Sequence, residues 1–397
     1  MNYKTGLLLL MLLILTNSSF AQQSDSLAPE TTATEAKLSF RDIPYLKEAF
    51  IDAAPTDRKD GILVGELGID GGNKEMILKL AQEIADNKHG NFDSFLIAHK
   101  GKLLFESYYL RGRINLPHPQ ASATKAYTAL ALGRAIQLGF LSMADLDKPL
   151  VSFLKDLDPT KFVEGVEKIT LHQALTMRSG IRISEEQREE FEKNPALLKG
   201  QGQIQAYLEH SAPITAESQS FKYQFDPILV MQIIDDVVPG SAKDFIKNEL
   251  LDKMGITTYD WGTDVSSLPR SGSGSSMTSR DMVKWGTLVI NKGKWKGKQL
   301  VPAAFIAKAT SKIVNQSEEY DDTASGVSGT AYGYFWWQAD LSVGDKSYFT
   351  KAARGGSGQT IILIEDLDLV VVTTTHRRVD DPVSVTATRI LPAFIKK

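Results

Sequence analysis

The chain of 397 residues contains no cysteine. Disulfide bonds, zinc sites built on thiolates and cysteine nucleophiles are therefore excluded. An excess of one charge is also missing, because 45 lysine and arginine residues are balanced by 48 aspartate and glutamate residues. Nucleic-acid-binding proteins usually carry a basic patch or stripe, so we expect no nucleic-acid partner. The composition, 42% hydrophobic and 23% charged, is typical of a globular protein with one large domain or two modest ones.

Long apolar runs are also scarce, and the clearest one lies at the N-terminus. Lys4 precedes the apolar stretch Leu7–Leu15, and the small-residue pattern Ser19-Phe20-Ala21 follows it. This order is typical of a secretory signal peptide, which we expect to cover residues 1–21. The stretch is short for a membrane span, although an uncleaved anchor is the alternative. We therefore expect an exported protein, periplasmic or secreted, with no stable membrane span after signal cleavage.

Residues 22–70 carry few structural patterns. From Gln22 to about Ala36 the chain is rich in serine, threonine, alanine and glutamate and has no apolar period. Such a segment buries too little apolar surface to offset the entropy of ordering it. We therefore expect a disordered leader followed by an N-terminal extension.

From residue 71 onwards, strand and helix patterns follow one another in blocks. Strand-like runs occur before Tyr109 and after Trp261, whereas the region between them is helical or looped. This order predicts an α+β fold: a mostly antiparallel sheet flanked by N- and C-terminal helices, with an inserted all-helical domain. The expected sheet domain comprises residues 71–121 plus 265–397, and the helical domain comprises residues 122–264.

The individual elements follow from the spacing of apolar residues and from turn and cap residues. The expected strands are Phe92–Ala98, Leu103–Tyr109, Tyr332–Trp337, Tyr348–Ala352, Thr360–Glu365 and Leu367–Thr375. The expected helices are 73–88, 169–177, 228–237, 242–254 and 382–395. A further helix should begin near Ser279, with Ser276 as its cap.

A serine and a lysine stand three residues apart, at Ser122 and Lys125. The helical pattern that follows runs to about Leu138 and ends at Gly139. Residues three apart lie on the same face of a helix, so the Lys125 amine can approach the Ser122 hydroxyl. Unpaired N–H groups at the start of a helix would also suit an oxyanion. The plainer interpretation is a capping serine beside a solvated lysine.

Two later stretches complete an ordered set with this motif. They are Phe221-Lys222-Tyr223-Gln224-Phe225-Asp226 and Ala353-Arg354-Gly355-Gly356-Ser357-Gly358-Gln359. Together the three stretches resemble the serine β-lactamase and penicillin-binding-protein superfamily, whose first motif is Ser-x-x-Lys. The match is strongest with the class C-like branch, which includes esterases, D-amino-acid peptidases and enzymes similar to 6-aminohexanoate-dimer hydrolase. The resemblance extends from about Phe92 to the C-terminus, through supporting segments such as Ile169–Gly180 and Asn291–Lys298.

The resemblance implies a serine hydrolase that forms an acyl-enzyme on Ser122, with Lys125 and Tyr223 sharing the role of the base. It implies no metal and no organic cofactor. A lysine can act as a base if its surroundings lower its pKa from about 10.4, and Tyr223 could do likewise if Lys125 favours its phenolate. The oxyanion hole would consist of the backbone N–H groups of Ser122 and Ser357, or Gly356 if the third motif is shifted by one residue. A buried tyrosine and a glycine-rich turn are the plainer interpretations of these stretches.

Two departures from the family pattern bear on the substrate. Phe225 stands where many lactamases have asparagine, and Gly355 stands where a hydroxyl residue is usual, although Arg354 keeps the positive charge. The usual side chains help to bind β-lactams and peptides, so their change favours an ester or a small amide as the substrate. Arg354, Gly355 and Gly356 are candidates for binding that substrate, and His118 either lines the cleft or lies on the surface.

Two alternative functions stay open at this point. One is a β-lactamase or a D-alanyl carboxypeptidase or peptidase that acts on cell-wall-like substrates. The other is a non-catalytic protein that keeps the fold and binds peptidoglycan or a lactam.

Overall fold

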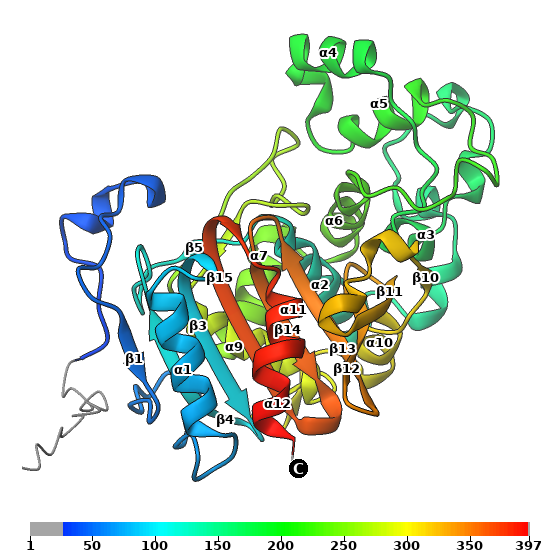
Figure 1. Cartoon of the computed structure of the whole chain (residues 1–397). Helices are drawn as coiled ribbons and strands as arrows, with labels where there is room; N and C mark the ends of the chain where they lie inside the picture. The colour runs from blue at the N-terminus through cyan, green and yellow to red at the C-terminus, as the bar shows by residue number, and fades with distance from the viewer. Residues whose placement is uncertain (1–26, 396–397) are drawn as a thin grey trace, which may run out of the picture.

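The structure, a computed structural model, describes residues 27–395 (Figure 1). The predicted signal peptide, residues 1–21, lies outside the described residues. Within residues 27–395, none of the helices combines the length and the apolar character needed to cross a membrane.

In the described part of the chain, a central sheet of ten strands joins the two ends of the sequence. Its order is β1-β4-β3-β15-β14-β13-β12-β11-β10, and β2 pairs with β4. The N-terminal hairpin β3–β4 therefore lies beside the C-terminal strand β15, with Ala98 opposite Val370. Neighbouring strands are antiparallel except β2 and β4, which are parallel. The strands are β1 Phe50–Asp52, β2 Leu63–Val64, β3 Gly90–His99, β4 Lys102–Tyr108, β10 Val314–Asn315, β11 Val327–Tyr332, β12 Trp337–Val343, β13 Lys346–Gly355, β14 Gln359–Ile364 and β15 Leu369–Val379.

The helices either cover the sheet or lie beyond one end of it. Figure 1 shows α1, α11 and α12 on the near face of the sheet, α9 behind it, and α3 to α6 beyond its end. This arrangement confirms the predicted fold class, while the expected domain boundaries stay a prediction. The helices are α1 Lys74–Ala85, α2 Thr124–Gln137, α3 Leu171–Leu175, α4 Glu185–Lys193, α5 Gly202–His210, α6 Asp226–Val237, α7 Ala242–Ile246, α8 Asp252–Met254, α9 Ser279–Ile290, α10 Ala303–Ala309, α11 Pro382–Val385 and α12 Leu391–Phe394.

Apolar side chains project from both faces of the sheet, so a layer of helices packs against each face. Along β14, Ile361 and Leu363 belong to one core cluster with residues of α2 and α9. Ile362 and Ile364 belong to the other, with residues of α1, α11 and α12. Successive side chains of a strand point to opposite faces, which explains the division. The continuous apolar runs of the C-terminal strands therefore reflect a sheet that is covered on both sides.

A small three-stranded sheet, β5-β7-β6, carries the segment that leads into Ser122. In this sheet β5 (His118–Pro119) pairs with β7 (Ser275–Met277), and β6 (Tyr259–Trp261) pairs with the other side of β7. The pairing brings the loop before β7 beside the start of α2, where the Ser275 N–H donates to the Thr124 hydroxyl at 3.3 Å.

The expected disordered leader is ordered from Leu27 onwards. The Pro29 carbonyl accepts a hydrogen bond from the Ile114 N–H at 2.9 Å, and Glu35 forms an ion pair of 2.8 Å with Arg113. The prediction is therefore wrong for residues 27–36. These residues have no apolar period, but hydrogen bonds and an ion pair to a distant segment hold them in place.

Two local predictions also differ from the structure. Tyr332–Trp337 is not one strand, because β11 ends at Tyr332 and β12 begins at Trp337. The chain turns between these two strands, and Tyr334 and Trp336 in the turn are buried. Aromatic residues are common in strands, so the turn resembles a strand in composition. The cap of α9 is Thr278 rather than Ser276, and its side chain accepts a hydrogen bond from the Asp281 N–H.

We expect Leu130→Ala to lower the free energy of unfolding by about 2–5 kcal/mol, because it leaves a cavity where α2 packs in the core. Leu138→Ala is the matched control at the end of the same helix, where the leucine is 41% exposed. It should change stability by about 0.5 kcal/mol or less. Chemical denaturation followed by circular dichroism measures both values, and equal losses would contradict the buried position of Leu130.

Candidate active site

Ser122 lies in a tight turn between β5 and α2. The turn is a short 3-10 helix whose first residue, Ala121, has a φ of 46°. An alanine in the left-handed region is strained and persists only where its surroundings hold it. Gln120 supplies part of this support, because its side chain donates to the His118 carbonyl and accepts from the Tyr127 hydroxyl, both at 2.8 Å. The Ser122 N–H, in the first turn of the helix, has no acceptor within that helix.

The Lys125 amine lies next to the Ser122 hydroxyl. Its Nζ is 2.8 Å from the Ser122 Oγ and 2.7 Å from the carbonyl oxygen of Gly272. Lys125 is 5% exposed, and burial lowers the pKa of its amine to about 8. A neutral amine can donate to the Gly272 carbonyl while its lone pair accepts from the Ser122 hydroxyl. The geometry therefore allows Lys125 to take the Ser122 proton.

Tyr223, from the second motif, lies beside the same amine. The centre of its ring is 4.6 Å from the Lys125 Nζ. Desolvation raises the pKa of Tyr223, and the Ser122 hydroxyl and the Arg354 charge offset this increase only in part. The expectation that Lys125 favours a Tyr223 phenolate is therefore not met. A protonated Tyr223 is suited to donating a hydrogen bond or a proton.

An aromatic cluster surrounds Tyr223. Its ring centre lies 5.9 Å from that of Trp337 and 6.0 Å from that of Tyr332. Tyr332 is fully buried, whereas Tyr223 is 40% exposed. The cluster gives one side of the site an apolar wall.

The third motif forms the tight turn between β13 and β14, which contains Gly356 and Ser357. A Cβ atom on Gly355 would lie 2.3 Å from the Gln120 carbonyl oxygen, so a side chain at this position would collide with the backbone. The end of β13 therefore lies against the segment that precedes Ser122. This contact links the first and third motifs.

Arg354 is already paired with an acidic side chain. Its Nη2 lies 3.0 Å and 2.9 Å from the two carboxylate oxygens of Asp381, the residue before α11. A carboxylated substrate would have to compete with Asp381 for the Arg354 guanidinium. The structure therefore weakens the assignment of Arg354 to substrate binding.

A cleft of about 440 Å³ opens at Ser122 and Lys125. Phe225, Gly272 and Ser273 contribute to its lining. Its volume suits a small-molecule substrate. The third motif, including Arg354, Gly355, Gly356 and Ser357, lines a separate hollow of about 510 Å³.

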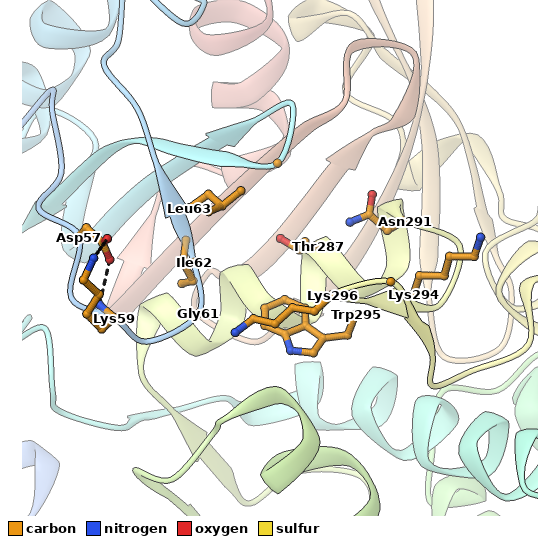
Figure 2. A pocket seen from close by; sticks show the side chains of 12 residues that line it. Asp57, Lys59, Gly61, Ile62, Leu63, Thr287, Asn291, Lys294, Trp295 and Lys296 are labelled. Carbon is orange, nitrogen blue, oxygen red and sulfur yellow. Dashed lines mark hydrogen bonds and ion pairs between the residues drawn. The ribbon is translucent and has the colours of Figure 1, made fainter.

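A larger cavity of about 790 Å³ lies elsewhere, between the loop of residues 57–63 and the hairpin formed by β8 (Lys294–Trp295) and β9 (Lys298–Gln299). Figure 2 shows Ile62 and Leu63 on one side of it and Trp295 and Lys296 on the other. All of its lining residues lie outside the three motifs. A catalytic site needs a nucleophile beside a base, so we assign the smaller cleft as the candidate active site.

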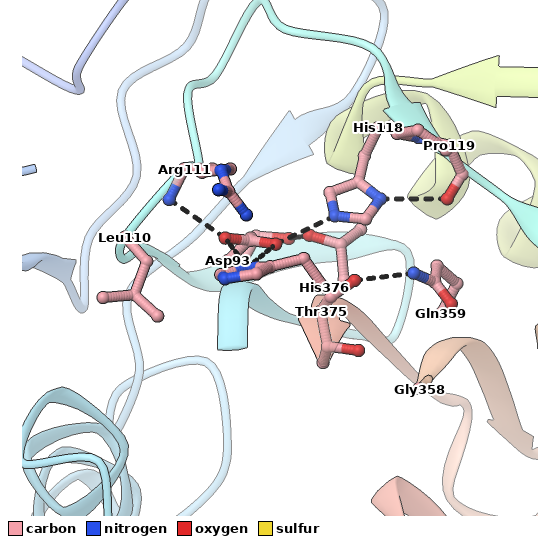
Figure 3. A network of polar contacts seen from close by, with 12 residues as sticks. Asp93, Leu110, Arg111, His118, Pro119, Gly358, Gln359, Thr375 and His376 are labelled. Carbon is pink, nitrogen blue, oxygen red and sulfur yellow. Dashed lines mark hydrogen bonds and ion pairs between the residues drawn. The ribbon is translucent and has the colours of Figure 1, made fainter. Parts of the chain in front are cut away.

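His118 neither lines the cleft nor lies on the surface. It is 4% exposed, and its Nε2 lies 2.9 Å from the Oδ2 of Asp93 (Figure 3). The prediction for His118 is wrong because its partner belongs to β3, far away in the sequence. A lone aspartate in an apolar strand gave no indication of this pairing.

Three further contributors to the site were missed in the sequence. Gly272 acts through its carbonyl, and the small residues around it are typical of any loop. Gln120 and Ala121 directly precede Ser122, and this position is the only sign in the sequence that they belong to the site. Neither side-chain chemistry nor spacing predicts a backbone acceptor or a strained φ.

Comparisons with known proteins bear on the family and the fold of the chain. The sequence profile of the Beta-lactamase family matches residues 80–393. None of the curated proteins compared matches the chain. The solved structures that resemble it include a protein from Bacillus anthracis described as a 6-aminohexanoate-dimer hydrolase, which is 19% identical with a TM-score of 0.57 over 82% of this chain and 85% of that one.

Two other solved structures show a comparable likeness. A class C β-lactamase is 16% identical with a TM-score of 0.59, over 82% of this chain and 97% of that one. A D-stereospecific amidohydrolase from Streptomyces sp. is 18% identical with a TM-score of 0.58, over 79% of this chain and 98% of that one. At these identities the likeness shows a shared fold.

We expect the lowered pKa of Lys125 to be visible in the stability of the protein. Between pH values of about 8 and 10.5 the unfolded lysine keeps its proton and the folded one releases it, so stability rises with pH. Because one pKa unit corresponds to about 1.4 kcal/mol, the wild type should gain about 3 kcal/mol relative to Lys125→Met over this interval. Urea unfolding at a series of pH values measures this gain. The same comparison with Lys243→Met, an exposed lysine on α7, controls for the loss of one lysine, and a flat difference for Lys125→Met would contradict the assignment.

Proposed function

Because the chain belongs to the Beta-lactamase family and is a serine hydrolase, we propose that it hydrolyses an uncharged ester or small amide through an acyl-enzyme on Ser122. The observation that carries this proposal is the buried Lys125 amine, 2.8 Å from the Ser122 Oγ. A serine hydroxyl becomes an effective nucleophile when a base accepts its proton. Lys125, with a pKa of about 8, is available in its neutral form at mildly alkaline pH.

In the proposed reaction, neutral Lys125 takes the Ser122 proton while the Oγ attacks the substrate carbonyl carbon. The oxygen that becomes negative accepts hydrogen bonds from the Ser122 N–H and from a second N–H in the third motif. Of Gly356 and Ser357 we favour Gly356, because the adjacent Gly355 already lies against the segment before Ser122.

The leaving group needs a proton when the tetrahedral intermediate collapses. The Lys125 ammonium holds that proton, and the Tyr223 hydroxyl beside it can pass it to the departing alcohol or amine. A water molecule then attacks the acyl-enzyme, with Lys125 again as the base, and releases the acid and the free Ser122 hydroxyl.

The proposed substrate is uncharged for two physical reasons. Arg354 is neutralised by Asp381, so a substrate carboxylate finds no free guanidinium there. Phe225 lines the cleft with an apolar ring where an amide side chain would bind the polar parts of a β-lactam or peptide. We also propose, from the predicted signal peptide, that the protein is exported to the periplasm or secreted.

A fluorophosphonate probe should form an adduct with the wild-type protein, and Ser122→Ala should abolish that adduct. Ser273→Ala is the matched control, because Ser273 lines the same cleft and should not affect labelling. Intact-mass spectrometry measures the adduct. Labelling that persists in Ser122→Ala would contradict the nucleophile assignment.

The same protein treated with penicillin distinguishes the remaining functions. Turnover of short acyl esters without hydrolysis of a chromogenic lactam would support the proposal. A penicillin adduct on Ser122 together with lactam hydrolysis would favour a β-lactamase or D-alanyl peptidase. Binding of peptidoglycan fragments without any adduct or turnover would favour the non-catalytic binder.

We expect Tyr223→Phe to lower kcat by about 10²–10⁴-fold, because the variant cannot relay a proton to the leaving group. Tyr320→Phe is the matched control, since Tyr320 is similarly exposed and its ring centre lies 5.8 Å from that of Trp337. It should change kcat little. Steady-state hydrolysis of an acyl ester measures both variants, and a Tyr223→Phe protein with wild-type kcat would refute the relay.

A further inference from the structure

We infer that Asp93 and His118 form a positioning pair for the proposed active site. The pair holds the strained turn before Ser122 and, through His376, the turn of the third motif. This inference rests on the proposed role of Ser122. Neither Asp93 nor His118 lines the cleft, so both act through the backbone segments that they hold.

Asp93 is a fully buried carboxylate on β3 (Figure 3). Its Oδ1 accepts a hydrogen bond from the Arg111 N–H at 2.9 Å. The His118 Nε2 lies 2.9 Å from its Oδ2, and the His376 Nδ1 lies 2.9 Å from both oxygens. Burial raises the pKa of Asp93, but the two histidines outweigh it and hold that pKa below its usual value. Asp93 is therefore ionised, and a buried carboxylate requires a positive partner.

The contacts of His118 identify it as that partner. Its Nε2 faces the Asp93 carboxylate, and its Nδ1 lies 3.0 Å from the Pro119 carbonyl oxygen. A carboxylate and a carbonyl can only accept hydrogen bonds, so both ring nitrogens of His118 must carry protons. His118 is therefore an imidazolium, packed against the Phe40 ring at 4.3 Å between ring centres.

His376 completes the cluster without needing a charge. Its Nδ1 donates to Asp93, and its Nε2 lies 2.9 Å from the Tyr45 hydroxyl, which can donate to a neutral ring. The Arg111 guanidinium lies over the Tyr45 ring, 5.1 Å from its centre. The titratable and charged groups around the pair are thus His376, Tyr45 and Arg111.

His118 is connected directly to the turn that presents Ser122. Its carbonyl accepts the hydrogen bond from the Gln120 side chain, and Ala121 follows in its strained conformation. A strained residue of this kind costs about 1–3 kcal/mol and relaxes unless its flanks are fixed. The ion pair with Asp93 fixes the flank on the N-terminal side.

His376 connects the cluster to the third motif. It lies on β15 directly after Thr375, whose carbonyl accepts a hydrogen bond from the Gln359 side chain at 2.6 Å. On the same strand, the Thr373 hydroxyl donates to the Gly358 carbonyl at 2.7 Å. Gln359 and Gly358 close the turn that contains Gly356. Asp93 therefore joins the two backbone segments that supply the proposed oxyanion donors.

The test compares Asp93→Asn and His118→Gln with His210→Gln, an exposed histidine on α5, in the full chain. Hydrolysis of a short acyl ester gives kcat and KM, and circular dichroism gives the folded fraction that corrects kcat. Misplacing reacting groups by about 1 Å can cost about 10²-fold in rate. We therefore expect the two cluster variants to lower kcat by about 10–100-fold with KM within about twofold, and His210→Gln to change neither. A corrected kcat within about twofold of wild type in both cluster variants would overturn the inference.

A second measurement depends neither on activity nor on the folding of the Asp93 variant. Nitrogen-15 NMR of the wild type at neutral pH should show protons on both ring nitrogens of His118, assigned by comparison with His118→Gln. A His118 ring with a single proton would overturn the inference. If Ser122→Ala loses the fluorophosphonate adduct while Asp93→Asn keeps its kcat, the nucleophile stands and the positioning pair fails. If the Ser122→Ala adduct persists, the proposed function fails whatever the state of His118.

Discussion

The Lys125 amine is held out of water at the point where three segments of the chain meet. It contacts the Ser122 hydroxyl one helical turn before it, the Gly272 carbonyl in the loop before β7, and the face of the Tyr223 ring. Removing an ammonium group from water is costly, and the lowered pKa of Lys125 reflects that cost. Within residues 27–395, no carboxylate pairs with this amine to restore its charge. Burial therefore suits the amine to its proposed role as a base, and that role requires each surrounding segment to keep it covered.

That cover depends on the central sheet and on α2. The helix is buried along nearly its whole length, so Lys125 projects from a rigid support rather than from a surface helix. The end of β13 closes against Gln120, and only a glycine at position 355 allows this approach. A fold in which N- and C-terminal strands pair side by side brings these two segments together, although they are far apart in the sequence. The strained conformation of Ala121 also requires this close packing, because a strained residue needs support from both sides.

The parts of this architecture that the sequence predicts are those that depend on local patterns. Helical spacing alone places Lys125 beside Ser122, and the expected strands Phe92–Ala98 and Leu103–Tyr109 correspond to the paired strands β3 and β4. What the sequence does not predict depends on contacts between distant segments. The pairing of Asp93 with His118 and His376 produces no pattern in the sequence, and neither does the contact between the Gly272 carbonyl and Lys125. The aromatic contacts of Tyr223 with Trp337 and Tyr332 likewise join different parts of the chain.

The positive charges of Lys125, Arg354 and His118 are weakened or paired in different ways. Burial lowers the pKa of Lys125 to about 8, Asp381 pairs with Arg354, and Asp93 pairs with His118. Arg270 and Asp264 both line the cleft and carry opposite charges. An oxyanion formed on the substrate would then be stabilised mainly by backbone N–H dipoles, which act at short range and only on the atom they point to. The proposed preference for an uncharged substrate thus depends on the pairing of Arg354 with Asp381 and on the apolar ring of Phe225 in the cleft.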